Sequence, residues 1–176
     1  LNNVKEITTL FVSQASSFLS FATGAVLDMN GIPIAGLNRS QAIPSGSYIG
    51  DTTDPALLSF DLDMNTQVLT LYFSETMRYS SLNVSSISLQ SRFNVSSPLQ
   101  SYRLTGGTAY PLASNDVVVV VHLITPDTDV LKIRKIAISN VTTWLTIGTG
   151  GIFNQAMEPV IPWENGITAL PVSIYT

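Results

Sequence analysis

Apolar and polar residues alternate along two neighbouring stretches of the chain, residues 58–64 and residues 68–73. In the first stretch Leu58 and Phe60 would face one side, while Ser59 and Asp61 would face the other. This period of two is typical of a strand with one buried face. Because only a short polar turn separates the two stretches, we predict a β-hairpin.

Five further segments have strand-like patterns, namely residues 87–89, 102–104, 117–124, 142–147 and 167–175. The segment 117–124 is apolar on both faces, which predicts a central strand. Residues 125–135 have apolar positions at near-helical spacing and predict a short helix or a crossover connection. Seven short strands between turns within residues 51–176 predict an all-β fold of the Ig-like β-sandwich type.

The first fifty residues repeat the pattern of the last fifty. Residues 13–26 overlie residues 139–152 without a gap, and Pro33 overlies Pro159 at the same offset of 126 positions. Self-similarity at a fixed period indicates tandem units of one design. We therefore predict two domains: residues 1–50, the C-terminal half of an Ig-like repeat with a linker, and residues 51–176, a complete repeat.

The partial unit has many apolar residues but lacks the strands that would cover them, since two strands alone cannot bury a sandwich face. Its large side chains include Phe11, Phe18, Leu19, Phe21, Val26 and Ile34. Leaving such side chains in water costs roughly 1.5–3 kcal/mol each. We expect the covering strands to come from an earlier segment of the same array or from a second chain, as in strand donation. A head-to-tail contact of this kind would propagate into a filament.

Composition narrows the classes of function. The chain is 45% hydrophobic and only 11% charged, with a net charge of −4 and an isoelectric point near 4.7. No cluster of basic residues is available to neutralise phosphates, so we expect no nucleic-acid partner. The strongest apolar run, residues 117–121, is far too short to span a membrane, and membrane insertion is not expected. A surface so poor in charge needs polar side chains, attached sugar or neighbouring subunits to cover it.

Four Asn-x-Ser/Thr sequons are present, at Asn38, Asn83, Asn94 and Asn140. They would carry glycans if the chain passes through a secretory pathway, and would otherwise be ordinary polar loop residues.

The aspartates are the best candidates for a binding site among the polar residues. Asp51 and Asp54 flank the predicted linker, and Asp61 and Asp63 share the polar face of one strand. Oxygen ligands of this kind suit calcium, which is the one cofactor we consider. Solvated aspartates on a strand face and in a turn are the alternative, because the spacing of an EF-hand loop is missing.

The residues offer little for catalysis. His122 is the only histidine and cysteine is absent, so histidine-based metal sites and thiol chemistry are not expected. We interpret His122 as a buried or edge histidine on an apolar strand. The sequence contains no Gly-x-Ser-x-Gly motif, the turn that exposes a nucleophilic serine. The chain is therefore expected not to be an enzyme.

The sequence resembles a known family over nearly its whole length. Residues 69–77 (LTLYFSETM), followed by residues 81–82 and 87–89, resemble the LTLTFSE…SSL…ITL stretch of bacterial-type Ig-like repeats in S-layer proteins and adhesins. Residues 25–31 resemble a turn late in the same domains, from which residues 154–157 depart, so we expect that turn to differ. Similar repeats occur in secreted algal and protist proteins, including those of flagellar hairs.

The resemblance implies an Ig-like fold that serves as a spacer, adhesin or filament subunit. We therefore expect a non-enzymatic structural subunit at the cell surface, whose partners are copies of itself or adjacent repeats. A carbohydrate- or cell-binding adhesin module is the alternative, with glycans as partners. The apolar side chains Val68, Tyr72, Phe153 and Trp163 are expected to form an exposed contact patch.

Overall fold

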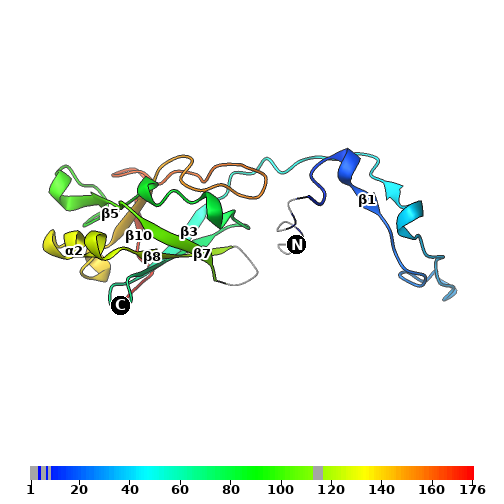
Figure 1. Cartoon of the computed structure of the whole chain (residues 1–176), viewed down its shortest axis with the longest axis horizontal. Helices are drawn as coiled ribbons and strands as arrows, with labels where there is room; N and C mark the ends of the chain where they lie inside the picture. The colour runs from blue at the N-terminus through cyan, green and yellow to red at the C-terminus, as the bar shows by residue number, and fades with distance from the viewer. Residues whose placement is uncertain (1–3, 5–6, 8, 113–116) are drawn as a thin grey trace. The chain divides into compact units, whose positions relative to one another are not determined.

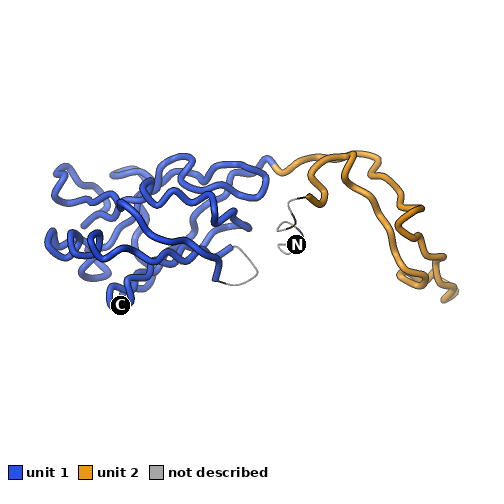
Figure 2. Tube along the Cα trace, in the orientation of Figure 1, with its two compact units in different colours: residues 1–6, 52–176 blue, residues 7–51 orange. Residues whose placement is uncertain are grey.

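The computed structural model describes residues 4, 7, 9–112 and 117–176. The chain forms two compact units, which are drawn in separate colours in Figure 2. The larger unit contains Val4 and residues 52–176, and the smaller contains residues 7–51.

The larger unit is built of β-strands in two sheets (Figure 1). One sheet has the order β11-β3-β4-β8-β7 and the other the order β10-β9-β5-β6. The strand bounds are β3 Leu57–Asp63, β4 Val68–Phe73, β5 Ile87–Gln90, β6 Ser101–Arg103, β7 Gly107–Pro111, β8 Val118–Leu123, β9 Trp144–Ile147, β10 Leu170–Pro171 and β11 Ile174–Tyr175. Short 3₁₀ turns connect them: η3 Tyr79–Ser81, η4 Val84–Ser86, η5 Pro98–Gln100 and η6 Asn140–Thr142.

Both sheets contribute side chains to one hydrophobic core. Alternate residues of β4 point inward, so that Leu69 and Leu71 are fully buried. Leu89 and Leu145, which lie opposite each other on β5 and β9, belong to the same cluster of buried residues. The expected all-β fold is therefore confirmed for this part of the chain.

The predicted hairpin is confirmed, because β3 and β4 pair antiparallel. One detail of the prediction is wrong: Leu58 is exposed, and Leu57 takes the inward position. The pairing register shifts between Leu57 and Ser59, and this irregularity turns the side chain of Leu58 to the outer face. The predicted central strand is confirmed, since β8 lies between β4 and β7.

The described residues contain more strands than the seven expected. β7, which begins at Gly107, was not predicted. The last expected strand, residues 167–175, is divided between two sheets: β10 pairs with β9, whereas β11 pairs in parallel with β3. Val172 and Ser173 cross between the sheets.

The expected short helix is α2, Thr125–Ile133, which contains a fully buried carboxylate. Asp127 accepts hydrogen bonds from the Tyr102 hydroxyl at 3.0 Å and from the Thr105 hydroxyl at 2.6 Å. The backbone N–H groups of Thr105 and Gly106 donate to its other oxygen at 2.8 Å and 3.3 Å. Burial, and then the bond to Asp127, raise the pKa of Tyr102. Asp127 thus ties the loop after β6 to the helix.

The smaller unit is a two-stranded antiparallel ribbon of β1, Phe18–Leu19, and β2, Ile43–Pro44. Two 3₁₀ turns accompany it, η1 Gln14–Ser16 and η2 Arg39–Gln41. Ser17 is the one buried residue among the described residues of this unit.

None of the helices in the described ranges has the length and apolar character that crossing a bilayer requires.

Candidate functional site

The repeat seen in the sequence is also a repeat of backbone geometry. Bridges in the smaller unit recur in the larger unit at residues 126 positions later. The corresponding pairs are Phe21 with Leu37 and Ile147 with Trp163, and Leu27 with Pro33 and Phe153 with Pro159. The two N–H···O hydrogen bonds of the first pair measure 3.1 and 2.8 Å in the smaller unit, and 3.1 and 2.9 Å in the larger.

The turns that precede β1 and β9 have the same backbone angles and the same hydrogen bond. Ser13 has φ −161° and ψ 166°, and Ser139 has φ −165° and ψ 167°. The hydroxyl of Ser17 donates to the Ser13 carbonyl at 2.7 Å, and the hydroxyl of Thr143 donates to the Ser139 carbonyl at 2.6 Å. A hydroxyl four residues after the turn residue therefore fixes both turns.

The late turn, which we expected to differ between the two halves, is closed in the same way in both. Asp28 Oδ1 accepts from the N–H of Ile32 at 2.8 Å, and Asn154 Oδ1 accepts from the N–H of Glu158 at 2.8 Å. An amide oxygen takes the place of a carboxylate oxygen, and the acceptor that the turn needs is retained.

The smaller unit and the matching part of the larger unit differ in how far their apolar side chains are exposed. Leu145 is 0% exposed, whereas its counterpart Leu19 is 60% exposed. Ile152 is likewise 0% exposed, and its counterpart Val26 is 64% exposed. The smaller unit thus has the backbone geometry of residues 133–172 of the larger unit, with its apolar side chains uncovered.

In the larger unit, the strands that pair with β9 show which neighbouring strand β1 lacks. β9 pairs on one side with β10 and on the other with β5, where Leu145 lies opposite Leu89 and Ile147 opposite Ile87. In the part of the chain that the structure describes, β1 pairs with β2 alone. We call residues 18–22, on the side away from β2, the open edge.

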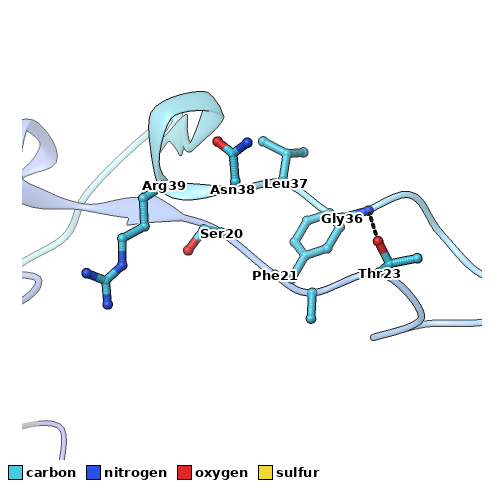
Figure 3. A pocket seen from close by; sticks show the side chains of 8 residues that line it. Ser20, Phe21, Thr23, Gly36, Leu37, Asn38 and Arg39 are labelled. Atoms are coloured by element: carbon cyan, nitrogen blue, oxygen red, sulfur yellow. Dashed lines mark hydrogen bonds between the residues drawn. The ribbon is translucent and has the colours of Figure 1, made fainter.

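A hollow of about 620 Å³ is lined by residues 20–23 and residues 36–39, two segments that pair through Phe21 and Leu37 (Figure 3). The N–H of Gly36 donates to the hydroxyl of Thr23 across one end of it, at 3.0 Å. In the larger unit Gly148 is the counterpart of Ala22, and its N–H donates to the carbonyl of Ser86 at 3.1 Å. The turn that precedes β5 therefore pairs with the residue of the larger unit that corresponds to Ala22.

A second groove, of about 350 Å³, is mostly apolar. It is lined by Phe11, Ser17, Phe18, Leu19, Ile43, Pro44, Ser45 and Tyr48. The sequence singled out the phenylalanines and Leu19 but not Ile43, Pro44 or Tyr48. Ile43 and Tyr48 correspond to Leu170 and Tyr175 at the end of the larger unit. The internal repeat is therefore the sequence signal that could have identified them.

The sequon asparagines Asn38, Asn83, Asn94 and Asn140 are all exposed. The side-chain oxygen of Asn38 accepts from the N–H of Ser40 at 3.0 Å, and that of Asn83 accepts from the N–H of Ser85 at 3.2 Å. Glycosylation of these residues stays a prediction.

The four aspartates proposed for calcium are distributed over both units: Asp51 belongs to the smaller, and Asp54, Asp61 and Asp63 to the larger. The described residues contain no group of three or more carboxylate, histidine or cysteine side chains placed to hold one ion. Asp61 accepts from the Tyr72 hydroxyl at 2.8 Å and from the N–H of Ile174 at 3.0 Å. Calcium binding stays a prediction.

Asp63 closes the β3–β4 turn. Its Oδ1 accepts from the N–H of Asn65 at 2.8 Å and from the N–H of Thr66 at 3.1 Å. Hydrogen bonds from the Thr66 side chain and from these two N–H groups hold the pKa of Asp63 below its ordinary value.

The interpretation of His122 was wrong, because this side chain is neither buried nor on an edge strand. It lies exposed on the outer face of β8, since Val121 and Leu123 take the inward positions on either side of it. Its ring stacks on Tyr110, with centroids 5.2 Å apart, and the two side chains also share a hydrogen bond.

The expected contact patch is not one exposed cluster. Trp163 is partly buried and packs against the core, and Phe153 is half-buried. Val68 and Tyr72 are half-buried residues of β4.

No protein-family model matches the chain, and no curated protein or solved structure matches it either.

Proposed function

We propose that the protein is a non-enzymatic structural subunit of an extracellular filament or appendage, built from Ig-like repeat units that assemble by completing one another's sheets. The observation that carries this proposal is that residues 7–45 repeat the backbone geometry of residues 133–172 with their core-type side chains exposed. Large exposed apolar faces on a protein surface are typical of interaction sites.

The surface chemistry supports an extracellular location. The chain has only 11% charged residues, and the four exposed sequon asparagines would carry glycans on a secreted protein. Attached sugar would supply the solubility that charged side chains supply elsewhere. Repeat units of one design also suit a mechanical role, since each unit adds length without new chemistry.

Antibodies raised against residues 52–176 test this proposal on intact cells of the source organism. We expect labelling of surface filaments without permeabilisation, at a spacing set by the repeat. Treatment of the native protein with a peptide N-glycosidase is expected to lower its mass. Labelling confined to permeabilised cells, together with an unchanged mass, would contradict the proposal.

Carbohydrate binding is a second candidate, favoured by the outer face of the five-stranded sheet. There Tyr110 stacks on His122, and Tyr72 donates to the Asp61 carboxylate. Aromatic faces beside carboxylates are chemically suited to sugar rings and their hydroxyls. Binding on a glycan array that disappears with Tyr110→Ala would favour this function, whereas an array without signal would exclude the sugars tested.

A further inference from the structure

The described chain contains two back halves but one front half. In the larger unit, the front half (residues 52–126) covers the back half (residues 133–172), and their side chains form one core. The second back half, residues 7–45, has the same bridges and turns but no front half over it. The front half of the chain is therefore already engaged.

We propose that residues 7–45 are completed by a second front half, a polypeptide segment with the strand pattern of residues 52–126 that docks on the open edge. This inference rests on the proposed function and names the partner of its assembly site. The partner contributes a strand equivalent to β5, which pairs antiparallel with residues 18–21.

The larger unit supplies the register of this pairing. Ile87 lies opposite Ile147 and Leu89 opposite Leu145, so the partner's equivalents of Ile87 and Leu89 lie opposite Phe21 and Leu19. Since side chains alternate across a strand, this register directs those apolar residues to the same face as Leu19 and Phe21. A slip of one residue would place serine there instead.

The turn before the partner strand also has a defined position. In the larger unit the carbonyl of Ser86 accepts from the N–H of Gly148, and Ala22 is the counterpart of Gly148. The partner's carbonyl at that point would therefore accept from the N–H of Ala22, on the open edge.

A second copy of residues 1–176 does not complete residues 7–45. Each copy of these residues brings two back halves and one front half, so mixing copies leaves one back half uncovered per copy. If residues 7–45 of one copy replaced residues 133–172 of another, one exposed back half would be exchanged for the other. The exchange buries no additional apolar surface and has no hydrophobic driving force.

The two back halves also differ in the size of their core side chains. Phe11 is the counterpart of the fully buried Ala137, and Phe21 is the counterpart of the buried Ile147. Larger side chains in a close-packed site force neighbours out of position. The front half that fits residues 7–45 is therefore expected to have smaller side chains opposite Phe11 and Phe21 than residues 52–126 have, which favours pairing of each back half with its own front half.

The test joins a copy of residues 51–126 in front of Leu1 of the full chain. Two versions are made: one with the native back half, and one with Phe11→Ala and Phe21→Ile, which match it to the added copy. We expect amide hydrogen exchange at residues 18–22 of the matched version to slow by about 100-fold relative to the unfused chain, because paired and buried N–H groups exchange only through opening. The native version is expected to show a smaller slowing.

The control is the matched fusion with Ile87→Asp in the added copy alone, which places a carboxylate in the new core. We expect exchange at residues 18–22 to return to the rate of the unfused chain, while residues 144–147 stay protected. Unchanged exchange in both fusions would overturn the inference. So would exchange in the unfused chain that slows as its concentration rises, because a second copy would then be covering the open edge.

These outcomes are separate from those of the proposed function. If antibodies fail to label the cell surface while the fusions show protection, the sheet completion stands and the extracellular filament is wrong. If labelling succeeds while the fusions show no protection, the filament is held together in another way.

Discussion

Truncation of two leucines at equivalent positions of the repeat gives the sharpest test of the uncovered back half. Leu145 is fully buried between the sheets, whereas Leu19, 126 positions earlier, is 60% exposed. Replacing a buried leucine with alanine costs about 2–5 kcal/mol, because the transfer free energy of the side chain is lost and a cavity remains. Replacing an exposed one costs less than about 0.5 kcal/mol.

Tryptophan fluorescence during urea unfolding measures this difference. Both tryptophans of the chain, Trp144 and Trp163, lie in the larger unit, so their signal follows the unfolding of that unit alone. With a urea dependence of about 1–3 kcal/mol per molar, a loss of about 3 kcal/mol lowers the unfolding midpoint by about 1–3 M. We expect this shift for Leu145→Ala and almost none for Leu19→Ala.

Leu58 provides a matched control, because it is also a leucine with 60% of its side chain exposed but belongs to the larger unit. Leu58→Ala is expected to leave the midpoint nearly unchanged. If Leu19→Ala lowered the midpoint by as much as Leu145→Ala, Leu19 would have to be buried in the core of the unit that contains the tryptophans, and the reasoning about the open edge would be refuted.

Other predictions concern single side chains of the larger unit and their local contacts. Asp127→Ala leaves the Tyr102 hydroxyl and the N–H groups of Thr105 and Gly106 without their acceptor, and is expected to cost about 3 kcal/mol in the same urea assay; a loss below about 1 kcal/mol would contradict the role given to this carboxylate. Met157 has φ 71°, a conformation that costs a non-glycine residue about 1–2 kcal/mol, and the extra freedom of glycine in the unfolded chain returns part of that. Met157→Gly is therefore expected to raise the melting temperature slightly, and a lowered melting temperature would count against strain at this residue. The folded-state pKa of Asp63 lies below the ordinary value of 3.8, so its carboxylate stabilises the fold above that pH and the stabilisation is lost as the pH falls through the folded pKa. On acidification, the Asp63→Asn variant is expected to lose less stability than the unmodified chain. Equal losses would contradict the stabilisation of the β3–β4 turn by the Asp63 carboxylate. If calcium binds, EDTA is expected to lower the melting temperature of the calcium-loaded chain, whereas an unchanged value would leave only the solvated aspartates.

Strand patterns in the sequence located the elements whose faces differ in polarity. Residues 58–64 and 68–73 alternate clearly, and they form the hairpin of β3 and β4. The strand β7 was missed because it has a glycine and a proline at its ends and no fully buried side chain between them. The division of residues 167–175 between two sheets depends on pairing with distant strands, which no local pattern encodes.

The candidate site was predictable in outline because the repeat aligns uncovered residues with buried ones. Leu19 and Val26 were named from the alignment, and both are exposed as expected from the missing strands. Tyr48 was not named, since the offset between the halves changes from 126 to 127 after residue 41 and conceals its match with Tyr175. The counterpart of Ser45 N–H donating to Ser17 is Val172 N–H donating to Thr143, which shows this change of offset in the structure.

Local contacts explain how the smaller unit has the shape of a back half without a front half over it. The hydroxyl of Ser17 bonds to a carbonyl four residues earlier, and the carboxylate of Asp28 bonds to an N–H four residues later. Such bonds need no distant partner, so the same turns form in a covered and in an uncovered half. Coverage is different, because it depends on side chains such as Ile87 and Leu89 that lie far away in the sequence. A back half shaped by local bonds presents its edge in the conformation that the partner strand requires, and this reduces the conformational entropy that completing the sheet would otherwise cost.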